Sequence, residues 1–302
     1  MKPVDVALAV LVAVIWGAAF VATRIGLDTF SPPQLTALRF VIAALPAVVL
    51  PRPPIRPSAL LAIGMTLFTG QFLLQFFAIA GGMPPGLASV IVQTQALFTV
   101  LLAAAFLGER PEARQVAGML IALVGVFLIA ATVGQSLTAI GLALGVASAT
   151  SWAVGNVLLK RIPRVDMFPL VIWLSLVPPL PSLALSMALD GAGGFARALA
   201  HAPWRALAAA LYLGLVATAF AYALWGTLLR RYATATVAPF ALLAPMVGAL
   251  ASAAVFGERF GPRRLTGMTL VLLGLLLIAC RLPACIVPWS SSGYSPPPKS
   301  SS

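Results

Sequence analysis

Chemically reactive side chains are scarce in this chain of 302 residues. It has a single histidine, His201, and only two cysteines, Cys280 and Cys285, with a proline between them. A protease would need a Ser–His or paired-aspartate constellation, and a metal site or disulfide framework would need more cysteine or histidine. The GxxxxGK[ST] loop that cradles nucleotide phosphates is also missing. The sequence therefore predicts no enzyme, no use of ATP by this chain, and no metal or cofactor.

Charged residues are also few. They make up 9% of the chain against 61% hydrophobic residues, and the mean hydropathy is +1.04, whereas soluble domains are about a quarter charged. Long apolar runs predict membrane-spanning helices, because about 20 helical residues cross the hydrocarbon core and backbone groups there must pair within the segment. We expect about ten spans, the first a true span and not a removed signal peptide. The runs are 4–23, 34–50, 58–80, 87–107, 116–131, 140–159, 168–189, 204–229, 235–256 and 265–280.

Positive residues gather in the connections, which is the pattern that orients a membrane protein. The net charge of +12 therefore does not indicate nucleic-acid binding. With a cytoplasmic N-terminus, the inside segments hold Lys2, Arg52, Arg56, Arg110, Arg114, Lys160, Arg161, Arg164, Arg230, Arg231, Arg281 and Lys299. The outside segments hold Arg24, Arg197, Arg205, Arg259, Arg263 and Arg264. This bias predicts that both termini are cytoplasmic, although the cluster at 259–264 runs against it.

Two stretches of the sequence repeat each other at a constant offset of 149. FLGERPEARQVAGMLIALVGVFLIA at 106–130 matches VFGERFGPRRLTGMTLVLLGLLLIA at 255–279, including a Gly-Glu-Arg turn in each copy. A tryptophan also marks the first span of each half, in WGAAF (16–20) and in WAVGN (152–156). We interpret the chain as two copies of one five-span unit.

An odd number of spans in each copy has a geometric consequence. The second copy enters the bilayer from the opposite side, so the copies are related by a pseudo-two-fold axis in the membrane plane. Inverted repeats of this kind recur in secondary transporters, with the substrate near the midplane between the repeats. The predicted fold is an all-α integral membrane protein, with ten transmembrane helices as two inverted five-helix repeats around a central cavity. We expect the repeats at 1–134 and 135–282, and a disordered tail at 283–302.

Three stretches resemble the EamA family of the drug/metabolite transporter superfamily. They are GMPPGLASVIVQTQALFTV (82–100), SWAVGN (151–156) and ATAFAYALWGTLLRRYATATVAPFALLAPMVGALASAA (217–254), and the similarity runs from about residue 5 to residue 280. The resemblance implies ten helices, both termini in the cytoplasm, a bacterial inner membrane, and an outward-opening basket with a central cavity. It is strongest to exporters of O-acetylserine and cysteine, while other relatives move amino acids, their derivatives and other small solutes.

Polar and aromatic side chains inside the spans are costly unless they pair or line a wet path. Residues three, four or seven apart share a helical face, and such faces occur in spans three, four, six and eight. Amide and hydroxyl groups supply donors and acceptors, and tryptophan and tyrosine supply apolar walls with one polar handle, which suits a small zwitterion. The candidate substrate-binding residues are Trp16, Gln71, Gln75, Ser89, Gln93, Gln95, Ser148, Trp152, Tyr222 and Trp225.

Each candidate also has a plainer interpretation. An intramembrane glutamine is often an interhelical hydrogen bond, and serine or threonine often bonds its own helix backbone. Tryptophan and tyrosine often form interfacial belts, as we expect of Trp204 and Trp289. Asn156 lies nearer the cytoplasmic end of span six, so we expect a gate or a packing bond there. Pro239 and Pro245 are expected to bend span nine and free carbonyls along the path.

Arg39 and four glycines carry further expectations. Arg39 lies a turn or two inside span two, where it could bind a carboxylate, but we favour snorkelling to the headgroups. Gly118 with Gly125, and Gly267 with Gly274, are seven apart on one face. They predict close helix packing, with a dimer contact as the weaker alternative. The Gly-Glu-Arg turns are interpreted as local ion pairs at helix ends and not as substrate contacts.

All seven carboxylates lie in connections or near span ends. Proton-driven carriers commonly use an intramembrane Asp, Glu or His, so we predict no central carboxylate proton relay; facilitated exit fits, and coupling through other groups stays open. The predicted function is secondary export of amino acids or related small metabolites by alternating access. The alternatives are efflux or uptake of a drug, an aromatic amino acid or a sugar derivative, and a non-transporting membrane subunit. The expected partners are a small-molecule metabolite and the lipid bilayer, with no nucleic acid, in a monomer or weak homodimer.

Overall fold

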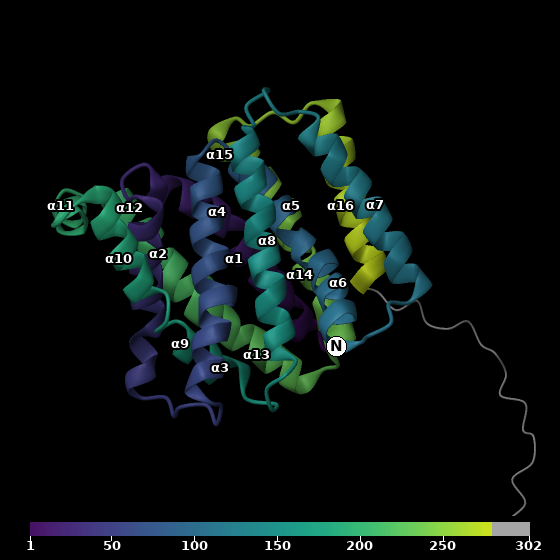
Figure 1. Cartoon of the computed structure of the whole chain (residues 1–302), viewed down its shortest axis with the longest axis horizontal. Coiled ribbons are helices and arrows are strands. Elements are labelled where there is room, and N and C mark those ends of the chain that lie inside the picture. The colour runs from purple at the N-terminus through teal and green to yellow at the C-terminus, as the bar shows by residue number, and fades with distance from the viewer. Residues whose placement is uncertain (280–302) are drawn as a thin grey trace, which may run out of the picture.

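The chain folds into a bundle of long helices that stand side by side (Figure 1). The structure is a computed structural model and describes residues 1–279, apart from three side chains near the start of α14 (Thr234–Ala241). All elements in that part of the chain are helical. Outside it fall the predictions about Cys280, Cys285, Trp289 and the tail at 283–302.

Five helical rods form the first half of the chain. Proline begins four of them, where its missing N–H costs nothing because the first turn of a helix has no acceptor for that group. The rods are α1 (Pro3–Leu27), α2 with η1 (Pro32–Ala44, Leu45–Val48), α3–η2–α4 (Pro57–Ile63, Gly64–Gly70, Gln71–Ala80), α5–η3–α6 (Pro85–Ile91, Val92–Thr94, Gln95–Leu107) and α7 (Ala113–Ala130).

Five more rods form the second half, with a short additional helix, α11 (Gly194–Ala200), between two of them. They are α8 (Ala139–Leu159), α9–α10 (Met167–Leu174, Pro179–Asp190), α12–η4–α13 (Trp204–Leu211, Tyr212–Phe220, Ala221–Arg231), α14–α15 (Thr234–Ala241, Leu243–Phe256) and α16 (Pro262–Ala279). In the described part of the chain, nine rods are long and apolar enough to cross a membrane, and Pro32–Val48 is a shorter apolar one. The predicted all-helical architecture is therefore confirmed, with the second of the ten predicted spans present as a shorter apolar helix.

Departures from the regular α-helix recur at matching places in the two halves. The π-helical segment η2 covers Gly64–Gly70, which the offset of 149 moves to 213–219, and the π-helical η4 covers Tyr212–Phe220. The 3₁₀ turn η3 at Val92–Thr94 moves to 241–243, where α14 gives way to α15. The internal repeat thus extends from sequence to backbone geometry, including its irregularities.

Prolines account for the interruption of span nine. Pro239 lies inside α14 and Pro245 in the first turn of α15. A proline offers no N–H to the carbonyl four residues earlier, so the Ala241 carbonyl lacks the donor that another residue at 245 would supply. The predicted bend is present as the break at Leu242 between α14 and α15.

The last helices of the two halves, α7 and α16, lie against each other (Figure 1). A Cβ at Gly118 would meet the carbonyl oxygen of Gly274 at 2.6 Å, and a Cβ at Gly125 would meet that of Gly267 at 2.6 Å. The offset of 149 exchanges these two contacts, because it turns Gly118 into Gly267 and Gly125 into Gly274. A pseudo-two-fold axis between two inverted repeats produces this pattern. The glycines therefore bring two helices of one molecule together.

The outer faces of the bundle carry large apolar side chains. Val48 is 92% exposed, Leu180 79% and Phe127 72%. Large apolar surfaces of this kind mark contact with a membrane or another protein. With the length and hydropathy of the helices, they make this an integral membrane protein.

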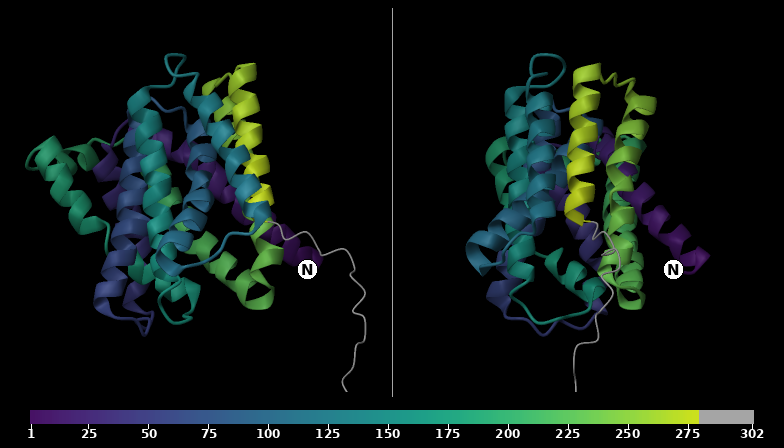
Figure 2. Two further views of the ribbon diagram at one scale, coloured as in Figure 1. Left: turned by 45° about the vertical axis from the view of Figure 1, so that its right-hand side comes forward. Right: turned by 90° about the vertical axis from the view of Figure 1, so that its right-hand side faces the viewer.

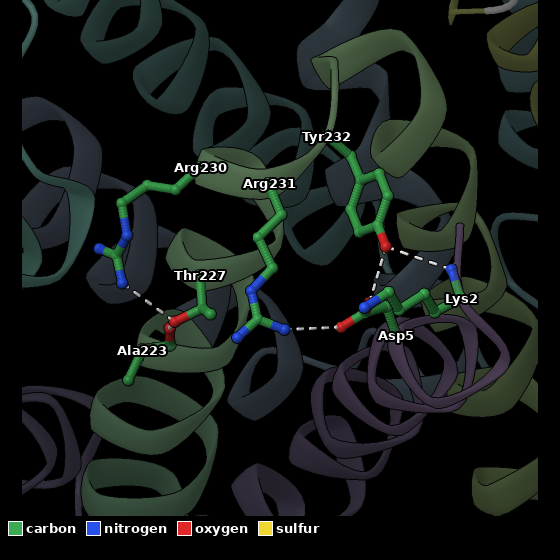
Figure 3. Close-up of polar contacts among 7 residues, drawn as sticks. All are labelled: Lys2, Asp5, Ala223, Thr227, Arg230, Arg231 and Tyr232. Atoms are coloured by element: carbon green, nitrogen blue, oxygen red, sulfur yellow. Dashed lines mark hydrogen bonds and ion pairs between the residues drawn. The ribbon is translucent and has the colours of Figure 1, made fainter.

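The N-terminal end of α1 projects obliquely from the bundle (Figure 2) and is tied to the end of α13 (Figure 3). Asp5 accepts hydrogen bonds from Arg231 Nη1 at 3.0 Å and from the Tyr232 hydroxyl at 2.7 Å. The backbone N–H of Lys2 donates to the same hydroxyl at 3.1 Å. The Asp5 side chain is only 4% exposed, so these partners satisfy a carboxylate whose burial alone would be destabilising. This cluster joins the two halves of the chain.

Replacing Gly118 by leucine is expected to weaken the contact between α7 and α16, because the new side chain would overlap the Gly274 carbonyl. Overpacking of this kind costs about 1–3 kcal/mol. The measurement is the temperature at which the purified protein in detergent loses its monodisperse chromatographic peak. Gly261→Leu is the matched control, because no atom lies within 4 Å of a Cβ at that position. Equal thermal stability of the two variants would contradict the role of the glycine contact.

Candidate functional site

A cavity of about 470 Å³ lies between helices of both halves of the chain. Its lining combines many apolar and aromatic side chains with a few polar ones, as is usual for small-molecule sites. The polar side chains are Thr23, Arg39, Gln71, Gln75, Ser89, Gln93, Gln95 and Asn156. The aromatic side chains are Trp16, Phe20, Phe68, Phe72, Trp152, Tyr222 and Trp225. The structure thus brings nine of the ten candidate substrate-binding residues together, and Ser148 is the exception.

The two ends of the cavity differ in exposure. Toward the face that carries the N-terminus, the lining reaches Leu159, the last residue of α8, and Met167, the first of α9, and both are partly exposed. Toward the opposite face, the lining ends at Thr23 and Ser89, which are each 1% exposed. The cavity is therefore more completely closed at the face opposite the N-terminus.

Contacts between α5 and α15 make that closure. The Ser89 hydroxyl donates toward the carbonyl oxygens of Gly86 at 2.7 Å and Pro245 at 3.0 Å. Beyond it, the Glu258 carboxylate accepts from the Ser252 hydroxyl at 2.6 Å and from the Gly86 N–H at 3.2 Å. Burial raises the pKa of Glu258, and these two hydrogen bonds oppose that rise. Ser89 therefore lines the cavity, but its hydroxyl proton is already engaged by backbone carbonyls of α5 and α15.

Aromatic rings of three helices form one wall. The Trp16 ring on α1 lies 5.3 Å from that of Tyr222 and 5.2 Å from that of Trp225, both on α13, in tilted arrangements. The indole N–H of Trp16 donates to the Ala217 carbonyl at 3.1 Å, which fixes the ring's orientation. Phe68 of η2 continues the wall, with its ring 6.4 Å from Tyr222. Rings held in this way give a substrate an apolar surface at little entropic cost.

The two glutamines of α4 form a polar pair. Gln71 Nε2 donates to Gln75 Oε1. Gln71 Oε1 is buried and has no hydrogen-bond partner among the described residues. The hydroxyl of Ser148 on α8 donates to the backbone carbonyl of Gln71 at 2.9 Å and is fully buried. Ser148 must therefore be corrected from a lining residue to a packing residue that holds α8 against α4.

Asn156 links the same helix, α8, to α6. Its Nδ2 donates to Gln95 Oε1 at 2.8 Å and to the Thr99 hydroxyl at 3.1 Å. Asn156 and Gln95 both line the cavity, one turn along α8 from Trp152 toward the N-terminal face. The Asn156 side chain therefore makes the expected packing hydrogen bonds and also lines the cavity. It lies nearer the binding region than we expected from its place in the span.

Arg39 is the second correction. The snorkelling interpretation is wrong, because the side chain is only 4% exposed and lines the cavity. Its Nε donates to the Thr218 hydroxyl at 3.1 Å, and its guanidinium carbon lies 4.1 Å from the centre of the Phe72 ring. Thr218 in turn donates to the carbonyl of Leu213 in the π-helical η4. In the sequence, the indication that Arg39 faces inward was its position several residues inside the predicted span 34–50.

The remaining sequence features lie away from the cavity. Glu109 of the first Gly-Glu-Arg turn pairs with Lys160 at the end of α8 at 2.8 Å, whereas Glu258 of the second turn is in none of the ion pairs that the described residues form. Neither turn lines the cavity. Trp204 is 72% exposed at the start of α12, where an interfacial anchor is expected. Among the described residues, no three or more His, Cys, Asp and Glu side chains gather in a way that could hold a metal ion.

Known proteins resemble this chain along nearly its whole length. The model of the EamA-like transporter family matches residues 5–131 and 139–280. A probable amino-acid metabolite efflux pump of Salmonella typhimurium is 40% identical over 284 residues, which cover 92% of this chain and 95% of that protein. A probable terminal-alkyne amino-acid exporter of Streptantibioticus cattleyicolor is 30% identical and covers 89% of this chain and 91% of its own.

A protein of solved crystal structure shares the fold with a TM-score of 0.59 and 18% sequence identity, over 92% of this chain and 98% of that one. Its likeness agrees with the helical architecture described above. The family match spans both halves of the chain, and the cavity lies between those halves. This chain therefore belongs to the EamA-like transporter family, and it is a membrane transporter and not an enzyme.

Proposed function

We propose that this protein exports amino acids or related small metabolites across a bacterial inner membrane, with O-acetylserine and cysteine-pathway compounds as favoured cargo. The observation that carries the proposal is the cavity of about 470 Å³ between the two repeats, which combines amides, hydroxyls and aromatic rings. A zwitterion can use both the donors and the acceptors of such groups. The names of the two relatives, an amino-acid metabolite efflux pump and an amino-acid exporter, support the cargo class and the direction.

Transport would follow from rocking of the two repeats about the cavity. The described residues place ten lysines and arginines at the face of the N-terminus and six at the opposite face, so the positive-inside rule favours a cytoplasmic N-terminus. In that orientation the closure at Ser89 and Pro245 is the outer gate. The structure then corresponds to a state that is closed to the outside, whereas the family resemblance implied an outward-opening basket. The two would be the end states of one cycle.

Overexpression of the protein in a bacterial host is expected to raise extracellular amino acids, above all cysteine-pathway compounds. Targeted metabolite profiling of the medium, compared with cells that carry an empty vector, is the measurement. The membrane fraction of the expressing cells must be shown to contain the protein. An unchanged medium at confirmed expression would contradict export.

Trp152→Ala is expected to lower transport about tenfold, because a cavity wall loses most of an apolar contact of about 1.5–3 kcal/mol. The measurement is uptake of labelled substrate into inside-out vesicles, with the amount of inserted protein determined in parallel. Trp204→Ala is the matched control, since that tryptophan is 72% exposed and does not line the cavity. Equal rates for the two variants would remove Trp152 from the substrate path.

No carboxylate lines the cavity in the described part of the chain, so we expect no obligatory proton relay through a central acid. In proteoliposomes, substrate flux should continue when the pH gradient is collapsed with an ionophore. A fluorescent pH indicator inside the vesicles reports proton movement. Stoichiometric movement of one proton with each substrate molecule would overturn this prediction. The partly buried Glu258, at the closed end, would then be the first acid to replace.

A further inference from the structure

The cavity holds one formal positive charge and no formal negative one among the described residues. Arg39 is the cation, and the chain's seven carboxylates all lie outside the lining. Arg39 is in none of the ion pairs that the described residues form. An unpaired guanidinium inside a membrane span is costly, and such residues characteristically mark a substrate or ion pathway. The missing counter-charge therefore points to the cargo.

The guanidinium is held so that one edge stays available. Its Nε is used by Thr218 and its face rests on Phe72, with Phe40 farther away at 5.6 Å. In the described part of the chain, neither Nη1 nor Nη2 has a hydrogen-bond partner, while the side chain lines the cavity. The N–H groups of arginine form a rigid fork that matches the two oxygens of a carboxylate. The anchored Nε and ring contact pre-organise this fork.

A second unsatisfied group lies close along the chain. Gln71 precedes Phe72, the residue on which the guanidinium rests, and it is 1% exposed. Its Oε1 accepts no hydrogen bond from the described residues, although Gln71 lines the same cavity. An amide oxygen is an acceptor that an ammonium group can satisfy. The cavity therefore offers unused donors for an anion, and one lining residue, Gln71, carries a buried amide oxygen that has no donor among the described residues.

We propose that Arg39 is the carboxylate anchor of the central site, so that a transported molecule must carry a free carboxylate beside its amino group. The inference rests on the proposed function, since it names the part of the amino acid that is recognised. Arg39 comes from α2 of the first repeat and Thr218 from η4 of the second. A molecule bound to the Arg39 fork would thus contact the hydrogen bond that joins the two repeats, and these repeats would move relative to each other during transport.

The test compares L-cysteine with L-cysteinamide, which has the same side chain and amino group but no carboxylate. Binding is followed by the fluorescence of the cavity tryptophans in purified full-length protein, and transport by counterflow of labelled L-cysteine in proteoliposomes. In the unmodified protein, cysteinamide should bind about 10- to 100-fold more weakly than cysteine, because hydrogen bonds to a charged group are lost. This comparison needs no variant and is independent of folding defects.

Variants then assign the discrimination to one side chain. Arg39→Gln should weaken cysteine binding by a similar factor of about 10 to 100 while leaving cysteinamide binding unchanged. Arg39→Lys keeps the positive charge but lacks the planar fork, so its affinity for cysteine should lie between those of the unmodified protein and of Arg39→Gln. Arg24→Gln is the matched control, because the Arg24 side chain is 43% exposed and already paired with Asp28. Arg24 does not line the cavity, so this variant should behave like the unmodified protein.

The outcomes separate the two proposals. Equal affinity for cysteine and cysteinamide, or cysteine binding that Arg39→Gln leaves intact, would overturn the carboxylate anchor and leave export standing. Cysteine binding that depends on Arg39 without counterflow of cysteine would support the anchor and count against the proposed transport. Binding and counterflow that both depend on Arg39 would support both.

Discussion

The absence of water in a membrane is the constraint on which this structure depends, because each polar group inside a span must find its partner within the protein. Most such groups do so locally: Ser175, for example, donates to the carbonyl of Val171 one turn earlier. Two cavity residues break the rule, since the Arg39 fork and Gln71 Oε1 have no partner among the described residues. Ser182 Oγ on α10 also lacks a partner among the described residues, but it lies outside the cavity lining, so a polar solute in the cavity can match only the first two groups.

Irregular backbone follows the same logic. The π-helical turns η2 and η4 each hold a threonine, Thr69 and Thr218, whose hydroxyl donates to the carbonyl five residues earlier. These threonines are 149 residues apart, so the two repeats share the device. Only Thr218 also accepts the Nε of Arg39. The two repeats thus share the backbone geometry of these π-helical segments, but only the second repeat uses its threonine to hold the arginine of the cavity.

Three contacts between the repeats are of two kinds, and the difference bears on how the halves could move. The α7–α16 contact is backbone against backbone, through glycines, and tolerates little change. The closure between α5 and α15 and the cluster around Asp5 consist of hydrogen bonds at opposite faces of the bundle. Hydrogen bonds can break one at a time as a gate opens, whereas the glycine contact can act as a fixed pivot.

Much of the fold could be read from the sequence, because apolar runs, short connections and an offset of 149 are visible without knowing where any helix lies. The set of polar and aromatic candidates followed from the cost of polarity in lipid. The errors concern direction. Ser148 faces a backbone carbonyl of Gln71 on a neighbouring helix, and Arg39 turns inward because Thr218, 179 residues later, offers it an acceptor. Sequence by itself determined which residues enter the membrane; only tertiary packing decided which way they face, since a helix's rotation about its axis is set by its neighbours.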